Sequence, residues 1–104
     1  MSTNFVQFEI LKIKTANDSG QPVVRIGEEG AVHVEFIDIE RVRRFVPQKF
    51  VAIGLEESCM MDGTSFVMED GVGLLCQESF ASVCERVSIA ESNKQRRFNI
   101  STGV

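Results

Sequence analysis

The side chains that most often perform catalysis are few in this chain and lie far apart. His33 is the only histidine among the 104 residues. A histidine that acts as a general base or binds a metal ion needs a nucleophile, an acid or a second ligand at a defined offset. No such partner stands at a helical or hairpin offset from His33, so we predict that it is a surface histidine.

The three cysteines do not form a recognisable site either. Cys59, Cys76 and Cys84 are an odd number, and their spacings match neither a disulfide framework nor a zinc-binding Cys-x-x-Cys pair. Carboxylates on both sides of Cys59 disfavour its thiolate form. Cys76 and Cys84 fall in an apolar strand and on the apolar face of a helix, where cysteine commonly serves as a small hydrophobic residue. We predict reduced cysteines without a catalytic role; an enzyme with an unrecognised site at Cys59 or His33 is the second alternative.

Carboxylates gather in the second half of the chain, but they lack the spacing of a cation site. They are Glu56, Glu57, Asp62, Glu69 and Asp70. A calcium-binding EF-hand loop places its oxygen ligands at regular positions, and that pattern is missing here. We therefore predict a solvated acidic surface that holds no metal ion, and we predict no cofactor.

One local excess of positive charge could bind an anionic partner. It consists of Arg41, Arg43, Arg44 and Lys49. A second basic group lies near the end of the chain, at Lys94, Arg96 and Arg97. Together they would suit a nucleic-acid-binding regulator, but the net charge of −4 and the isoelectric point near 5.0 disfavour that function, because an acidic surface repels phosphate. Salt bridges to an acidic surface, on this protein or on a protein partner, are the favoured use of the patch.

The composition also bears on the compartment and on the core. No stretch approaches the roughly 20 apolar residues that span a bilayer, and the first residues do not resemble a secretory signal. We therefore expect a cytoplasmic protein without a membrane-spanning segment. Because Trp and Tyr are absent, the eight Phe residues are expected to supply the bulk of the core.

Hydrophobic alternation in the first half of the chain predicts strands. Val6, Phe8 and Ile10 alternate with polar residues, and the phase slips at Leu11, which predicts a bulge or the end of a strand there. After a turn over 17–20, a short apolar segment over 23–26 predicts a returning strand.

The clearest amphipathic strand is expected over residues 31–37. There the apolar side chains alternate with His33 and Glu35. The next segment, 38–45, fits either a short helical turn capped by Asp38 or a strand, and the helical turn is favoured. Pro47 should interrupt the chain, because it has no N–H for a helix or for a central strand.

The second half of the chain is predicted to form strand, loop, hairpin and helix in that order. Strands are expected over 50–53, 64–69 and 72–77, with a polar loop from Glu56 to Gly63 and a tight hairpin turn at Asp70-Gly71. Ser79 is expected to cap a helix over about 79–88. Its apolar stripe consists of Phe80, Val83, Cys84 and Val87.

Residues 91–104 form a mostly polar tail after a single β-rich domain over 1–90. Such a tail is usually mobile unless it is tied down, and an added edge strand that contains Phe98 and Ile100 is the ordered alternative.

The order of features over 45–87 resembles that of the small bacterial flagellar proteins of the FlbD type. The features are Phe45-Val46-Pro47, the strand over 50–53, Glu56-Glu57, the hairpin on Gly71 and the helix start at Gln77-Glu78-Ser79. The end of LytTR-type DNA-binding domains has a similar hairpin and helix. Residues 1–40 have no counterpart in the flagellar family, and the loop at 58–61 is an insertion. The resemblance implies a motility-associated cytoplasmic role in a bacterium, without catalysis and without a site that can be carried over.

These patterns predict an α+β protein. We expect a mainly antiparallel, twisted sheet or partial barrel of five to seven strands, with one C-terminal helix packed on it. A small sheet of this kind leaves edge strands that can pair with another chain, so self-association into a homo-oligomer is expected. The function that follows is a non-enzymatic protein-interaction or assembly module, which presents a sheet edge and the Arg41/Arg43/Arg44/Lys49 patch to a protein.

Overall fold

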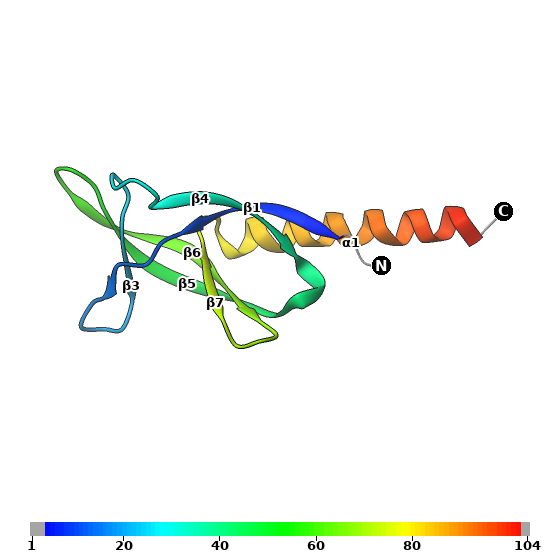
Figure 1. Cartoon of the computed structure of the whole chain (residues 1–104), viewed down its shortest axis with the longest axis horizontal. Helices are drawn as coiled ribbons and strands as arrows, with labels where there is room; N and C mark the ends of the chain where they lie inside the picture. Colours follow the sequence, from blue (N-terminus) through cyan, green and yellow to red (C-terminus); the bar gives the residue numbers. More distant parts are fainter. Residues whose placement is uncertain (1–3, 103–104) are drawn as a thin grey trace.

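The computed structural model describes the backbone of residues 4–102 and the side chains of residues 4–92. One seven-stranded sheet and one long helix make up this part of the chain (Figure 1). In chain order the elements are β1 (Phe5–Leu11), β2 (Thr15–Ala16), β3 (Pro22–Arg25), β4 (Val32–Asp38), the 3₁₀ turn η1 (Ile39–Arg41), β5 (Val42–Ile53), β6 (Ser58–Met68), β7 (Gly73–Cys76) and α1 (Phe80–Thr102). The predicted α+β class and the predicted strand number are confirmed.

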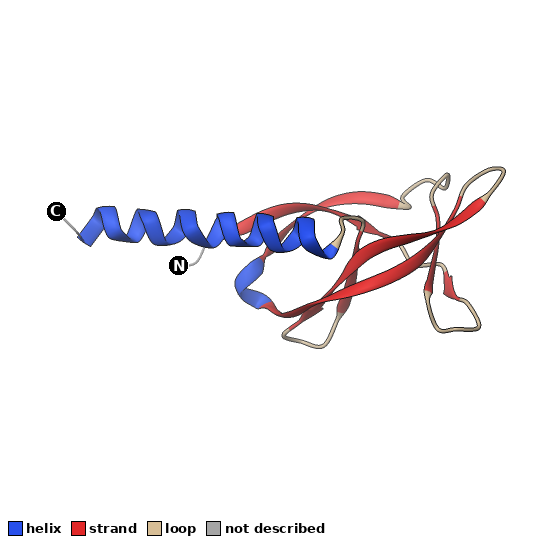
Figure 2. Cartoon of the chain, turned by 180° about the vertical axis from the view of Figure 1, so that it is seen from behind, coloured by secondary structure: helices blue, strands red, loops and turns tan. Residues whose placement is uncertain are grey.

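The sheet is mixed but mostly antiparallel, and it does not close into a barrel. Its strand order is β2-β3-β5-β6-β7-β1-β4, and β3 with β5 is the parallel pair. The sheet is strongly curled, and α1 runs beside its concave side and then past its end (Figures 1 and 2). The two outermost strands are β2 at one edge and β4 at the other.

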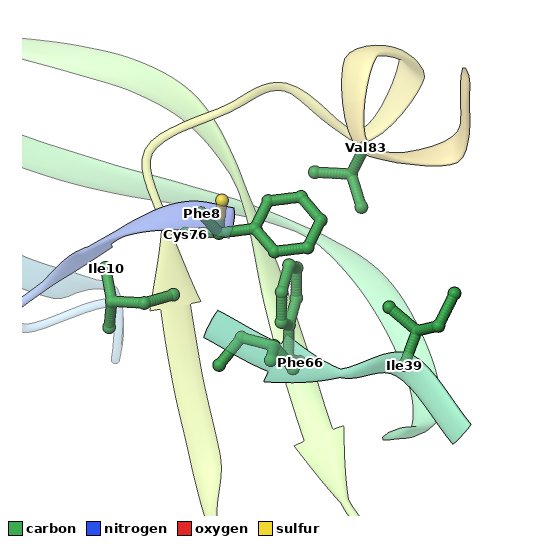
Figure 3. Packing of buried hydrophobic residues seen from close by; sticks show 7 residues of the cluster. Phe8, Ile10, Ile39, Phe66, Cys76 and Val83 are labelled. Atoms are coloured by element: carbon green, nitrogen blue, oxygen red, sulfur yellow. The ribbon is translucent and has the colours of Figure 1, made fainter. Parts of the chain in front are cut away.

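Two hydrophobic clusters lie on opposite faces of this sheet. Ile10 pairs with Cys76, and both belong to the larger cluster under the helix (Figure 3). Leu11 pairs with Leu75, and both belong to the smaller cluster. Because successive side chains of a strand point to opposite faces, neighbouring residues of β1 can each be buried in a different cluster. β1 ends at Leu11, as one of the two predicted alternatives had it, and its register with β4 contains no bulge. The phase slip at Leu11 reflects the second core, in which this last residue of the strand is buried.

Three phenylalanines form the centre of the larger cluster. The rings of Phe8 and Phe45 both meet Phe66 edge to face, with centroids 4.9 and 5.0 Å from it. Aromatic pairs in this arrangement are stabilised beyond the apolar area that they bury. Phe50 lies in the smaller cluster instead. Phe residues thus stand in both clusters, whereas Phe5, Phe36 and Phe80 are exposed.

The 38–45 segment contains both of the structures that its sequence allowed. Asp38 accepts a hydrogen bond from the Glu40 backbone N–H and caps η1, as predicted, and β5 begins directly afterwards. β5 then continues through Pro47, which was expected to interrupt it. The backbone C=O of Ile53 accepts a hydrogen bond from Ile26, on the β3 side of β5. By alternation the Pro47 nitrogen also faces that side, where no strand pairs with this part of β5 within residues 4–102, so no ladder hydrogen bond is lost.

The expected polar loop from Glu56 to Gly63 is mostly strand. β6 starts at Ser58, which pairs with Ile53, the last residue of β5. The turn that connects the two strands is therefore short. Polar residues are compatible with this strand because its first five side chains are exposed. The second hairpin is as predicted: Gly71 has a φ of 90° at the turn between β6 and β7.

The helix starts where it was expected but ends much later. The Ser79 hydroxyl accepts a hydrogen bond from the Ser82 backbone N–H at 3.3 Å, which confirms the predicted cap. Val83 is fully buried, with Val87 and Ala90 packed beside it. Cys84 is exposed, so its predicted place on the buried face is wrong.

Residues 91–102 continue the helix, so the alternative of an added edge strand is wrong. The predicted edge-strand residues Phe98 and Ile100 and the basic tail residues belong to this last part, whose side chains lie outside the described ones. This half of α1 projects beyond the sheet (Figure 1).

Candidate interaction surface on the open edge of the sheet

β4 is an outermost strand, and one side of its backbone has no partner strand within residues 4–102. Its other side pairs with β1 in an uninterrupted antiparallel register. The Lys12 N–H donates to the Ala31 C=O at 2.8 Å, and the Ile39 N–H donates to the Asn4 C=O at 3.3 Å. Odd-numbered residues between these two points therefore direct their backbone groups to β1. The N–H and C=O groups of the even-numbered residues point outward, and these are Val32, Val34, Phe36 and Asp38.

The side chains of this strand are also arranged differently from the prediction. Val34 is 52% exposed and Phe36 is 68% exposed, although their alternation predicted a buried face. The core lies on the opposite face, where Ile37 is buried and Glu35 stands opposite Phe8. Phe5 of β1, 53% exposed, lies on the same face as Phe36, because Phe36 pairs with Gln7 two residues away. We call Phe5, Val32, Val34 and Phe36 the β4 strip.

A groove of about 430 Å³ lies between the end of β4 and residues of β1, η1, β6 and β7. Apolar side chains supply most of its lining, and three charged side chains complete it. The lining consists of Phe5, Glu35, Phe36, Ile37, Asp38, Arg41, Met68 and Leu74.

His33 lies on the surface, as predicted, and contacts Glu35. Its Nε2 is 2.6 Å from the Glu35 Oε2, and both side chains are exposed. No group of three or more His, Cys, Asp or Glu side chains in the described part of the chain is placed to hold a metal ion.

The cysteines occupy three different environments. Cys59 is exposed on β6, and Cys84 is exposed on α1. Cys76 is fully buried in the larger cluster. Burial raises the pKa of the Cys76 thiol to about 11, and the nearby Glu78 carboxylate contributes to the increase. A thiol with so high a pKa is a poor nucleophile.

The predicted basic patch does not form one surface. Arg44 and Lys49 lie on β5 at positions of opposite parity, so their side chains point to opposite faces of the sheet. Lys49 pairs with Asp62 across the strands at 3.2 Å, and the Arg41 Nε is 3.8 Å from the Asp38 Oδ2. Arg43 occupies the irregularity in the register between Val42 and Arg44.

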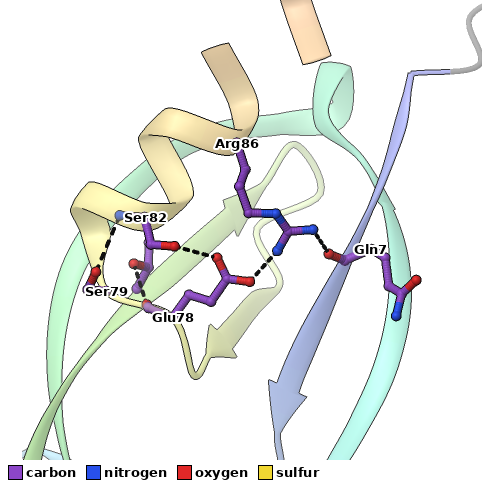
Figure 4. A network of polar contacts seen from close by, with 6 residues as sticks. Gln7, Glu78, Ser79, Ser82 and Arg86 are labelled. Atoms are coloured by element: carbon purple, nitrogen blue, oxygen red, sulfur yellow. Dashed lines mark hydrogen bonds and ion pairs between the residues drawn. The ribbon is translucent and has the colours of Figure 1, made fainter. Parts of the chain in front are cut away.

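A polar cluster between the helix and β1 was not anticipated from the sequence. The Arg86 guanidinium donates hydrogen bonds to the Glu78 carboxylate and to the backbone C=O of Gln7 (Figure 4). It also lies over the Phe8 ring, with its central carbon 4.5 Å from the ring centroid. Ser82 donates to the same carboxylate at 2.9 Å. The spacing of four residues between Glu78, Ser82 and Arg86 was the available signal.

The Arg86 cluster holds the helix against the sheet. β7 pairs with only the last two residues of β1, so the earlier backbone of β1 lacks that neighbour. Arg86 supplies a donor to β1 at this point. The cluster is therefore a structural clamp.

Comparisons with known proteins give no relative: no protein-family model, no curated protein and no solved structure matches this chain. Within the described residues, no helix is both long enough and apolar enough to cross a membrane.

Proposed function

We propose that this protein is a non-enzymatic interaction module, which binds another protein chain through the open edge of β4. The observation that carries the proposal is a seven-residue edge strand whose outer backbone groups are unpaired in the described structure and whose exposed face is apolar. An added strand would gain hydrogen bonds from the edge and apolar contacts from the β4 strip.

The other open edges support this proposal by contrast. Natural sheets protect edges with short strands, charged side chains, prolines and bulges. β2 has two residues. The unpaired part of β5 contains Pro47, a register irregularity and the basic residues Arg43, Arg44 and Lys49. β4 has no proline, lysine or arginine and a continuous register with β1, and its acidic side chains are Glu35 and Asp38.

This contrast also gives the basic residues of β5 a role. They keep other chains from pairing with that edge, and they leave β4 as the edge that is open to a partner. The same residues then need no nucleic acid to explain them.

Site-specific photo-crosslinking tests the proposed function. The full chain is produced in its native host with a benzophenone amino acid in place of Phe36, or in place of Leu55 as the control. Leu55 is 98% exposed in the β5–β6 turn, far from β4 in the sheet order. We expect a discrete crosslinked product from position 36, identified by mass spectrometry, and none from position 55.

A second variant links the product to the strand edge. Val34→Pro removes an outward N–H of β4 without removing a hydrogen bond to β1, so the crosslink should disappear while the fold remains. No product at position 36, or an equal one at position 55, would refute the proposed function.

A further inference from the structure

We infer that the partner of β4 is the β4 of a second copy of this chain, paired antiparallel with Val34 opposite Val34. The two sheets then join into one sheet across a twofold axis perpendicular to it. This inference rests on the proposed function, because it names the partner of the same edge.

The backbone limits the possible registers. In an antiparallel pair, residues that exchange hydrogen bonds stand directly opposite each other. The outward residues of β4 are even-numbered, so an even-numbered residue of one copy must stand opposite an even-numbered residue of the other. A symmetric pair can therefore be centred only on one residue facing its own copy, such as His33, Val34, Glu35 or Phe36.

The side chains select the register that is centred on Val34. In it, His33 of each copy stands opposite Glu35 of the other, and Val32 stands opposite Phe36. The His33–Glu35 positions form the pairs without backbone hydrogen bonds, where side chains approach most closely. An imidazole N–H can donate to a carboxylate across the strands. The same two side chains already contact each other within one strand, where the His33 Nε2 is 2.6 Å from the Glu35 Oε2. Apolar residues therefore face apolar residues, and each His33 faces a Glu35.

The neighbouring registers each create a mismatch. Centring on Glu35 places two carboxylates opposite each other and sets Val32 against Asp38. Centring on Phe36 sets Val34 against Asp38, and centring on His33 places the two histidines together. Like charges that face each other across strands are destabilising, whereas aromatic and β-branched pairs are stabilising.

The twofold axis also places the two β4 strips on the same side of the joined sheet. Side chains that stand opposite each other in a pair of strands share a face. Val34 and Phe36 of one copy then lie beside Val34 and Val32 of the other. Val32, Val34 and Phe36 each gain an apolar neighbour from the other copy. No other symmetric register provides such a neighbour for all three of these residues.

Complementary charge variants test both the partner and the register. In His33→Glu, both cross-strand contacts of the pair become carboxylate against carboxylate. In Glu35→Lys, both lose the carboxylate that accepts a hydrogen bond from the imidazole N–H. Each variant alone should therefore dimerise about tenfold more weakly or worse.

An equimolar mixture of the two variants should dimerise again. In the heterodimer, the carboxylate introduced at position 33 of one copy faces the ammonium introduced at position 35 of the other. The second cross-strand contact joins the unchanged Glu35 of the first copy to the unchanged His33 of the second. Both contacts are then complementary, as they are in the unmodified pair.

Sedimentation velocity on the full chain provides the readout. The unmodified chain should reach about twice its 11.6 kDa mass as concentration rises. Glu57→Lys makes the same charge change as Glu35→Lys but lies in the β5–β6 turn, so it should dimerise like the unmodified chain. Circular dichroism confirms that each variant is folded.

Three outcomes would overturn the inference. They are a chain that stays monomeric up to about 1 mM, single variants that still dimerise fully, and a mixture of folded variants that stays monomeric. None of them refutes the proposed function, because a crosslink from position 36 to a different protein would still support an interaction through β4. Loss of that crosslink refutes both.

Discussion

Gly63 is the position where adding one methyl group should be most harmful. A Cβ atom built on Gly63 would lie 2.6 Å from the backbone oxygen of Cys76 and 2.9 Å from the Phe50 ring. Both distances are shorter than a carbon atom normally tolerates. Phe50 is fully buried, and Cys76 is held between Ile10 and Thr64 in the sheet, so neither neighbour can move freely.

The expected cost of Gly63→Ala follows from these two contacts. Overpacking of a well-packed core costs about 1–3 kcal/mol. Against this, an alanine lowers the entropy of the unfolded chain and returns about 0.4–1 kcal/mol. With a clash of about 2 kcal/mol, in the middle of its range, the net loss in the free energy of unfolding should be about 1–1.6 kcal/mol, which lowers the melting temperature of a domain of this size by roughly 4–13 °C.

Gly73→Ala is the matched control. Gly73 lies in β7, it pairs with Val67, and no atom lies within 4 Å of a Cβ built on it. Its substitution should leave the stability unchanged or raise it slightly. Urea unfolding of both variants, followed by circular dichroism, compares them directly. If Gly63→Ala were as stable as Gly73→Ala, the close approach of β6, β7 and Phe50 would be wrong.

Two further predictions concern the helix clamp and the buried thiol. Arg86→Met should lower the free energy of unfolding by about 1–2 kcal/mol, because it removes the cation–π contact with Phe8 and the hydrogen bonds to Glu78 and Gln7. Urea unfolding measures this loss, with Cys84→Ser, an exposed change on the same helix, as the control. Equal stability of the two variants would contradict the clamp. The Cys76 thiol has a pKa of about 11 in the folded protein and an ordinary value of 9.0, so its contribution to stability is fully present below pH 9 and is lost as pH rises through 11. The free energy of unfolding should therefore decrease more between pH 8 and pH 10.5 for the unmodified chain than for Cys76→Ala. An equal decrease in both proteins would refute the raised pKa of Cys76.

Local patterns predicted most of the architecture because several elements depend on nearby residues. The cap at Ser79, the turn at Gly71 and the cap at Asp38 each involve contacts within a few residues. Such signals are readable from a single sequence. The α+β class and the C-terminal position of the helix followed from them.

The errors arose where distant parts of the chain decide the outcome. The strand end at Leu11 was predicted, but the burial of Leu11 was not, because it depends on a second core on the other face that Leu75 and Phe50 help to form. The strand at 58–63 is set by its pairing with β5 rather than by its own polar composition. Pro47 is compatible with a strand only because that side of β5 has no neighbour there. Tertiary pairing overrides local propensity at each of these positions.

The alternation over 32–36 is the most informative of these errors. An alternating apolar strand normally indicates one buried face, and here the apolar face is the exposed one. The apolar positions nevertheless coincide with the open backbone positions of the edge. Val32, Val34 and Phe36 are even-numbered, and the even-numbered residues of β4 direct their backbone N–H and C=O groups outward. A chain that pairs with this edge therefore meets free backbone groups and apolar side chains at the same positions. Of the edges compared above, β2 has only two residues and the unpaired part of β5 carries proline and basic residues, which is the composition expected if β4 is the edge selected for association.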